Sequence, residues 1–400
     1  MTGDWLVINS GSSSLRFAVF GETGGTGLEA LAARYRGHLA GLGGEAVRFR
    51  VEDGGGVTLI DETPTGSVDQ SRALDWLLGW LEARADPMPL RGIGHRIVHG
   101  GRDFAAPERL DDRVLARLAA LTPLAPLHQP HGLAPVRLFT RRWPAVPQVA
   151  CFDTAYHAKQ PAVARSFALP RRLTDAGLIR YGFHGLSYDY LSRRLAQRLG
   201  RSATGRVVMA HLGQGASLCA ALDGGSVASS MGFSTLDGLP MGTRCGYLDP
   251  GLVLHLLTQE GLSAERVGEI LYRESGLLGV SGLSADMRVL LASDEAGARE
   301  AIELFVYRVV REIGALAATL GGLDHLVFSG GIGERASAVR AAIGAGCRWL
   351  GLELDAQTNA RHEMTISAAG SRIGAWVIPT DEERMIAFYT RELIGADAED

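Results

Sequence analysis

The stretch that decides the fold is Trp5-Leu-Val-Ile-Asn-Ser-Gly-Ser-Ser-Ser-Leu-Arg-Phe-Ala-Val-Phe20. Two apolar runs, residues 5–8 and 15–20, flank a turn of serine and glycine. Short apolar runs on either side of turn residues are typical of two antiparallel strands. The sequence therefore predicts that the chain opens with a β-hairpin whose turn is rich in glycine and serine.

The same pattern returns about half a chain later, in Val207-Val-Met-Ala-His-Leu-Gly-Gln-Gly-Ala-Ser-Leu-Cys-Ala-Ala-Leu222. Asn9 and His211 occupy matching places in the two stretches, and so do Gly11 and Gly213. We interpret this repeat as a structural duplication, in which two similar α/β halves each open with a glycine hairpin.

The rest of the chain alternates strand and helix patterns, which favours the α/β class. Residues 21–66 predict strands with loose turns. Further strands are expected at 90–98, 146–152, 326–329 and 375–378, and helices at 69–85, 111–121, 304–320 and 337–343, with a C-terminal helix of about ten residues. No long linker separates the halves.

Composition narrows the class of protein. A length of 400 residues suggests two domains, and 46% hydrophobic residues suffice for a core in each. The net charge of −4 gives no basic field for nucleic acid or an anionic membrane, so neither partner is expected. No apolar run of about 18 residues occurs. Four widely spaced cysteines without a Cys-x-x-Cys pair fit a reducing cytoplasm.

Three glycine-rich loops are expected directly after apolar strands, at residues 9–14, 211–217 and 330–334. Such loops suit phosphates, because the backbone can approach an anion closely and its N–H groups can point at it. The P-loop motif is absent from the sequence. A dinucleotide fingerprint at Gly331-x-Gly333 is disfavoured, because roughly 70 residues follow it, too few for the rest of such a sheet.

Three arginines stand apart from other charges: Arg96, Arg244 and Arg288. Guanidinium groups suit carboxylate and phosphate, and they neutralise charge on a transferring phosphoryl group. The alternative is that these arginines bond loop carbonyls and are structural.

Two carboxylates follow apolar strands: Asp153 and Glu382. Ligands of α/β sheets bind beyond strand carboxyl ends, and Mg²⁺ needs one or two carboxylates with phosphate oxygens. The alternative is a helix N-cap, which suits Asp381 better than Asp153.

The histidines offer a separate set of candidates. His95 and His99 are four residues apart, but they flank a strand, so zinc is not expected. His128 lies in a proline-bounded loop. His184, flanked by Phe183 and Gly185, suits either a donor to developing charge or a satisfied core histidine.

Taken together, the sequence resembles the acetate kinase family nearly from end to end. The resemblance is carried by ten ordered segments: residues 9–16, 94–101, 124–128, 152–157, 181–185, 211–215, 241–246, 279–284, 331–334 and 379–383. It implies a duplicated ribonuclease-H-like (actin-like) fold, with two similar domains and a cleft between them. The expected domains are 1–153 plus 384–400 on the substrate side and 154–383 on the nucleotide side.

The resemblance implies reversible transfer of a phosphoryl group from ATP to acetate, giving ADP and acetyl phosphate, with Mg²⁺ or Mn²⁺, in a cytoplasmic homodimer. It assigns catalysis to Asp153, His184 and Arg244, and the metal to Asn9 and Glu382. Substrate contacts would come from Arg96, Val98, Leu127, His128 and Phe183. Nucleotide contacts would come from Arg16, His211, Leu212, Gly213, Gln214, Gly215, Asp286, Met287, Arg288, Gly331, Ile332, Gly333, Glu334 and Arg335.

One physical argument qualifies the role of Asp153. A carboxylic acid with a pKa of about 4 is already ionised at neutral pH, so the acceptor has no proton to remove. We therefore expect Asp153 to act through the metal or by positioning, rather than as an obligatory base.

Three positions depart from the family pattern: Gln214, Arg335 and Thr235. Gln214 and Arg335 bear on the phosphoryl donor, and Thr235 bears on the choice between acetate and propionate. A propionate or other short-acyl kinase is thus one alternative, and an actin-like nucleotide switch that phosphorylates no small molecule is another.

Overall fold

The computed structural model describes residues 3–11, 14–44, 47–64, 68–83, 90–200 and 204–396. The chain forms two compact units, Met1–Ala155 with Asp381–Asp400 (unit 1) and Tyr156–Thr380 (unit 2). The sequence-based boundaries differ from these by two or three residues. The difference matters for Glu382, which was expected in the second domain and lies in unit 1. It begins a helix that packs on the unit 1 sheet.

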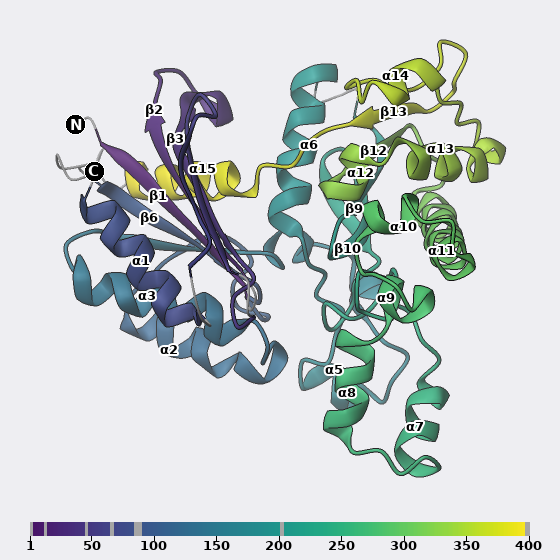
Figure 1. Cartoon of the computed structure of the whole chain (residues 1–400), viewed down its shortest axis with the longest axis horizontal. Coiled ribbons are helices and arrows are strands. Elements are labelled where there is room, and N and C mark those ends of the chain that lie inside the picture. Colours follow the sequence, from purple (N-terminus) through teal and green to yellow (C-terminus); the bar gives the residue numbers. More distant parts are fainter. Residues whose placement is uncertain are drawn as a thin grey trace. The chain divides into compact units, whose positions relative to one another are not determined.

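Unit 1 is built on a mixed sheet of eight strands in the order β5-β4-β3-β2-β1-β6-β8-β7. The strands are β1 (Asp4–Ser10), β2 (Ser14–Glu22), β3 (Leu31–Ala40), β4 (Arg48–Asp53), β5 (Thr58–Glu62), β6 (Leu90–Ile97), β7 (Glu108–Arg109) and β8 (Gln148–Phe152). The helices are α1 (Gln70–Ala83), α2 (Asp112–Ala120), α3 (Gln129–Arg142) and α15 (Glu382–Ala396) (Figure 1).

Unit 2 is built on five strands in the order β11-β10-β9-β12-β13. They are β9 (Arg206–Leu212), β10 (Ala216–Leu222), β11 (Gly225–Ser229), β12 (His325–Ser329) and β13 (Gly374–Val377). Its helices are α4 (Ala162–Arg165), α5 (Arg171–Asp175), α6 (Gly185–Leu199), α7 (Pro250–Thr258), α8 (Ala264–Arg273), α9 (Gly276–Ser281), α10 (Met287–Leu291), α11 (Ala296–Leu320), α12 (Gly330–Arg335), α13 (Ser337–Gly346) and α14 (Ala356–Ala360).

The two sheets share one topology, which confirms the predicted duplication of an α/β fold. In unit 1, β2 is antiparallel to β3 and β1, and β6 lies parallel between β1 and β8. In unit 2, β10 is antiparallel to β11 and β9, and β12 lies parallel between β9 and β13. The opening hairpins also correspond, since Asn9 pairs with Arg16 and His211 pairs with Ser217. Ser12 and Ser13, at the tip of the first predicted loop, lie outside the described residues.

Strand β6 shows how side-chain alternation separates a core face from a site face. A Cβ on Gly92 or Gly94 would collide with Ile394, Thr390 or Ile386, so both glycines face α15 and let it pack closely. Arg96 follows on the same face. The intervening residues, such as Ile93, pack with the apolar core on the α1 and α3 side.

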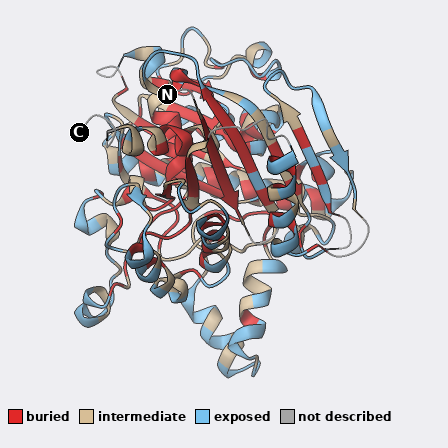
Figure 2. Ribbon diagram, turned by 90° about the vertical axis from the view of Figure 1, so that its left-hand side faces the viewer, coloured by how far each residue is buried: buried red, intermediate tan, exposed pale blue. Residues whose placement is uncertain are grey.

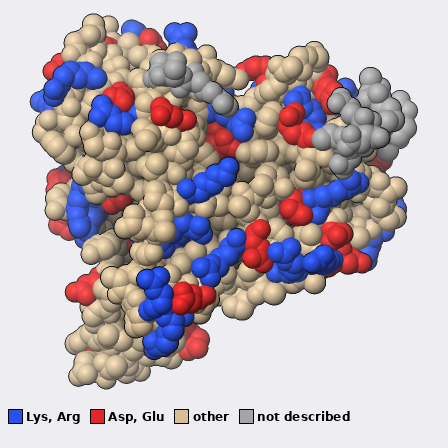
Figure 3. Space-filling model, turned by 180° about the vertical axis from the view of Figure 1, so that it is seen from behind, with Lys and Arg blue, Asp and Glu red and all other residues tan. Residues whose placement is uncertain are grey.

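Burial follows the same plan in both units. The central strands are buried, while exposed residues gather on the helices and on the edge strand β5 (Figure 2). No helix in the described part of the chain combines the length and the apolar composition that a membrane crossing requires. On the face seen in Figure 3, basic side chains are interspersed with acidic ones.

Two predictions of local secondary structure were wrong. Residues 330–334 were expected to be a loop, but they belong to helix α12, which begins directly where β12 ends. Gly330 makes this abrupt change possible with a φ of 74° in the left-handed region. The C-terminal helix has 15 residues rather than about ten.

Candidate active site

Arg96 and Asp153 form a buried ion pair at the carboxyl ends of β6 and β8. Nε of Arg96 lies 3.1 Å from both carboxylate oxygens of Asp153, and Nη2 donates to Oδ2 at 2.5 Å. The Asp153 side chain is 1% exposed and that of Arg96 19%. Burial raises the pKa of Asp153, and Arg96 opposes this rise by charge and hydrogen bonding. The pair therefore holds a guanidinium fork rigidly at the sheet edge.

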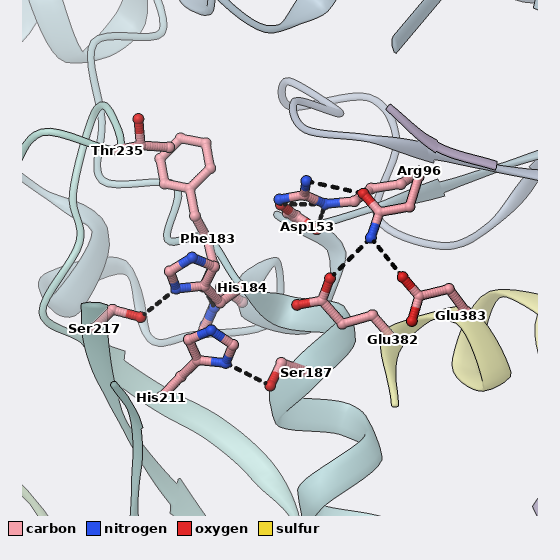
Figure 4. Close-up of polar contacts among 12 residues, drawn as sticks. Arg96, Asp153, Phe183, His184, Ser187, His211, Ser217, Thr235, Glu382 and Glu383 are labelled. Carbon is pink, nitrogen blue, oxygen red and sulfur yellow. Dashed lines mark hydrogen bonds and ion pairs between the residues drawn. The ribbon is translucent and has the colours of Figure 1, made fainter. Parts of the chain in front are cut away.

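Asn9 connects this pair to the start of α15. Its Oδ1 accepts from Nη1 of Arg96 at 3.2 Å. Its Nδ2 donates to Glu382 at 3.3 Å and to Glu383 at 3.1 Å (Figure 4). Residues from opposite ends of the sequence thus meet in one polar cluster, which we call the unit 1 cluster: Asn9, Arg96, Asp153, Glu382 and Glu383.

The acidic residues at the start of α15 have separate tasks. Asp381 accepts from the backbone N–H of Arg384 at 3.0 Å, so it caps the helix, as the alternative interpretation expected. Arg36 donates to Asp381 at 2.6 Å. Burial and then neighbouring Glu382 raise the pKa of Glu383, while Arg16 and Arg36 lower it. Glu383 was not singled out from the sequence, because one carboxylate in Asp-Glu-Glu looks like another.

In unit 2, His184 and His211 stack face to face, with centroids 4.4 Å apart and planes 23° apart. Nδ1 of His184 lies 2.8 Å from Oγ of Ser217, and Nδ1 of His211 lies 2.9 Å from Oγ of Ser187 (Figure 4). His184 immediately precedes α6 with a φ of 57°, a conformation that non-glycine residues adopt mainly where surrounding structure enforces it.

Gly215 brings Arg244 to the same histidine. A Cβ at Gly215 would lie 3.2 Å from Nε2 of His184 and 3.6 Å from Nη2 of Arg244. Nη1 of Arg244 donates to the backbone carbonyl of Thr235 at 2.8 Å. The predicted catalytic residues His184 and Arg244 are therefore close together, and a side chain at position 215, in the turn between β9 and β10, would crowd the imidazole.

The backbone around α12 is fixed by hydrogen bonds with Glu334 and Arg340, which the sequence did not predict. Glu334 accepts from the N–H groups of Gly330 at 3.0 Å and Thr380 at 3.3 Å. Arg340, which is 0% exposed, donates to the carbonyls of Gly333 at 2.8 Å and Glu334 at 2.9 Å. A single arginine in a helical pattern is typical of a solvent-exposed position, so the sequence did not predict that Arg340 is buried.

Asp286 and Arg288 pair with each other at the start of α10. Asp286 caps the helix by accepting from the N–H of Arg288 at 2.9 Å, and the Arg288 guanidinium folds back to 2.5 Å from Oδ2. This side-chain hydrogen bond lowers the pKa of Asp286. Arg288 is 86% exposed. Its ligand contacts stay a prediction.

The remaining predicted residues fall in both units. Val98 is buried, Leu127 is 40% exposed and His128 immediately precedes α3. Phe183 is buried in unit 2, so the grouping of Val98, Leu127 and Phe183 as one acyl pocket stays a prediction. Leu212, Gly213 and Gln214 form the end of β9 and the following turn, Met287 is buried in α10, and Gly331, Ile332 and Arg335 lie in α12.

Comparison with known proteins assigns the family. The model of the acetokinase family matches residues 4–388. The chain belongs to the acetokinase family. Among the family's curated members, the acetate kinase of Rhodopseudomonas palustris CGA009 is 50% identical over 396 residues, covering 97% of this chain and 98% of the relative. The acetate kinase of Methylocella silvestris is 49% identical over 395 residues, with 97% of each covered.

Solved structures of the family agree with the fold. A propionate kinase from Francisella tularensis superposes with a TM-score of 0.89 at 33% identity, covering 98% of this chain and 99% of that one. The acetate kinase of Porphyromonas gingivalis superposes with a TM-score of 0.85 at 32% identity, covering 98% and 100%. The duplicated actin-like fold expected from the resemblance is thus confirmed.

Proposed function

We propose that the protein is an acetate kinase, which transfers the γ-phosphoryl group of ATP to acetate and runs in both directions. The observation that carries this proposal is the Arg96–Asp153 pair, a rigid guanidinium at a sheet edge in a chain of the acetokinase family. Relatives at about half identity over nearly the whole chain carry the name acetate kinase, which favours acetate over longer acids.

Arg96 supports binding of the acceptor carboxylate. A guanidinium has five N–H groups, and the contacts with Asp153 and Asn9 use Nε, Nη2 and Nη1 once each. Further N–H groups on Nη1 and Nη2 can donate to a substrate carboxylate in a fork geometry. Asp153 then acts by orienting Arg96, since the ionised acceptor needs no base.

His184 and Arg244 support stabilisation of the transferring phosphoryl group. During transfer the bond from phosphorus to the ADP oxygen breaks and a bond to an acetate oxygen forms, with charge spread over three phosphoryl oxygens. Fixed donors aimed at that charge lower the barrier without reorganisation. The Nε2 of His184 and the Nη2 of Arg244 lie beside Gly215 and suit this task.

The expected nucleotide residues are proposed to bind ATP or ADP. They are Arg16, His211, Leu212, Gly213, Gln214, Gly215, Asp286, Met287, Arg288 and the α12 residues Gly331 to Arg335. The abrupt start of α12 after β12 and the glycine turn after β9 leave backbone positions without bulky side chains, which supports phosphate binding.

Magnesium, or manganese in its place, is proposed to assist the reaction. No group of three or more His, Cys, Asp and Glu side chains in the described ranges is arranged to hold a metal by itself. Asn9 and Glu382 lie together in the unit 1 cluster and would fit a hard cation that keeps waters and substrate oxygens if the Asn9 amide turned, because its nitrogen faces Glu382 and its oxygen faces Arg96 in the structure. When bound, the cation would neutralise phosphate charge.

A cytoplasmic homodimer is also proposed. Helix α7 supports the dimer, since it exposes two leucines, Leu252 at 45% and Leu254 at 61%, on the surface. All four cysteines are free thiols, which suits a reducing compartment.

The test is an acyl-phosphate assay. The protein is incubated with ATP, Mg²⁺ and acetate, propionate or butyrate, and acyl phosphate is trapped with hydroxylamine. We expect product with acetate and the highest kcat/KM for acetate. Product with none of the acids would exclude a kinase and favour a nucleotide switch, whereas a higher kcat/KM for propionate would reassign the acceptor.

A further inference from the structure

Each of the two stacked histidines makes a hydrogen bond to a serine of another element. His184, at the start of α6, contacts Ser217 on β10, while His211, on β9, contacts Ser187 on α6. Both serines are completely buried. Each contact uses Nδ1, so the ring atom that can face a ligand is Nε2 in both histidines.

Behind Ser217 lies a second buried hydroxyl, that of Tyr188 in α6. Tyr188 is 0% exposed, and its hydroxyl makes a short hydrogen bond with Oγ of Ser217. Burial raises the pKa of Tyr188 well above its ordinary value, so the phenol keeps its proton. Among the described residues, the Tyr188 hydroxyl makes its hydrogen bond with Ser217, and a phenol is the more acidic of the two hydroxyls, so we place the donated proton on Tyr188.

This order leaves one arrangement for the remaining proton. Oγ of Ser217 accepts from Tyr188, and its own hydrogen points at Nδ1 of His184. We propose that Tyr188 and Ser217 form an ordered hydrogen-bond chain that fixes His184 as the neutral tautomer with its proton on Nε2. The inference rests on the role proposed above for His184 in phosphoryl transfer and makes Ser217 and Tyr188 positioning residues.

The chain matters because Nε2 is the atom beside Gly215 and Arg244. The tautomer with the proton on Nδ1 would present a lone pair to a phosphoryl oxygen, and a repulsion would replace a hydrogen bond.

The proposal is tested by the tautomer itself. The chain has 11 histidines, so protein labelled with ¹⁵N-histidine gives a tractable long-range ¹H–¹⁵N spectrum, and His184→Ala assigns the signal. At pH 8 we expect an unprotonated Nδ1 and a protonated Nε2 for His184. Ser217→Ala should give a mixture of tautomers and lower kcat about tenfold, with KM values for acetate and ATP within threefold.

Two further variants separate positioning from packing. Tyr188→Phe keeps the ring and should also mix the tautomers, whereas Ser217→Thr keeps the hydroxyl and should restore the Nε2–H form. Ser192→Ala is the matched control, because Ser192 is a buried serine of α6 whose hydroxyl bonds the Gly224 carbonyl. It should leave the His184 tautomer and kcat unchanged.

The outcomes are distinct. A wild-type His184 with its proton on Nδ1, or an unchanged tautomer in both Ser217→Ala and Tyr188→Phe, would overturn the chain. Full activity of His184→Ala would instead contradict the proposed role of His184. The spectrum needs no turnover, so failure of the acyl-phosphate assay would leave the tautomer result readable.

Discussion

Replacing Asp153 by Asn tests the central ion pair most directly. The wild-type carboxylate, 1% exposed, takes three close contacts from Arg96. An amide at this position removes the negative charge and turns an N–H donor toward a guanidinium that only donates. Breaking a buried ion pair from one side costs about 3–5 kcal/mol, because the partner charge stays buried. We expect the free energy of unfolding of unit 1 to fall by about that amount.

Urea unfolding followed by tryptophan fluorescence measures this change. Four of the six tryptophans, Trp5, Trp76, Trp80 and Trp143, belong to unit 1, so the signal reports mainly on that unit. The matched control is Asp61→Asn. Asp61 also receives two guanidinium contacts, from Arg48, but both side chains are largely solvated, so its loss should matter far less.

Activity gives the second readout of the same variant. Without its orienting carboxylate, Arg96 should bind the acceptor poorly and in several orientations. We therefore expect kcat to fall at least about 100-fold, because a displaced binding group misaligns the reacting atoms. The reasoning is refuted if Asp153→Asn is no less stable than Asp61→Asn. Near-normal activity with unchanged Mg²⁺ dependence would show that Asp153 neither positions Arg96 nor supports the metal.

Three further predictions concern pH, the glycine turn and the acyl group. Burial lowers the pKa of His95 and His157 to about 4, so each imidazole stays neutral in the folded protein at a pH where the unfolded chain is protonated. Each histidine should therefore lower the free energy of unfolding by about 2 kcal/mol as the pH falls from 7 to 5. Urea midpoints that do not shift over this range would contradict the prediction. Gly215→Ala should lower kcat at least tenfold, because its Cβ would crowd the catalytic imidazole, whereas the control Gly268→Ala, with open space in α8, should keep full activity. Thr235→Val should raise the kcat/KM of propionate relative to acetate about threefold to tenfold, since a methyl replaces a hydroxyl, and an unchanged ratio would remove Thr235 from the acyl site.

Much of the fold could be predicted because the opening hairpins carry strong local signals. The apolar runs and the glycine turns around Asn9 and His211 indicated both strands and the duplication. Arg96 and Asp153 could be singled out because charged residues beside apolar strands are unusual. That they pair with each other depends on the parallel register between β6 and β8, which joins Arg96 to Cys151 and which no local pattern contains.

Other features arise only from tertiary packing. Helix α3 was not expected, because its sequence begins Gln-Pro and contains Pro135, yet burial of Leu133, Val136 and Phe139 stabilises it. The short helix α12 looked like a loop, since glycines dominate its first turn. The buried guanidinium of Arg340 donates to two backbone carbonyls of that helix. A contact of this kind between a side chain and a neighbouring helix leaves no pattern in the sequence.

The close packing of α15 on Gly92 and Gly94 has a consequence for how the chain is made. During synthesis the strands of unit 1 emerge first, but the helix that covers one face of their sheet follows only after the whole of Tyr156–Thr380. At about 5–20 residues per second, that delay is roughly 10–45 s. The contiguous unit 2 can fold within it, while the nascent sheet, with its apolar surface and the Arg96–Asp153 pair uncovered, waits for its last helix. Newly made unit 1 therefore exposes apolar surface of its sheet until the last helix has been synthesised.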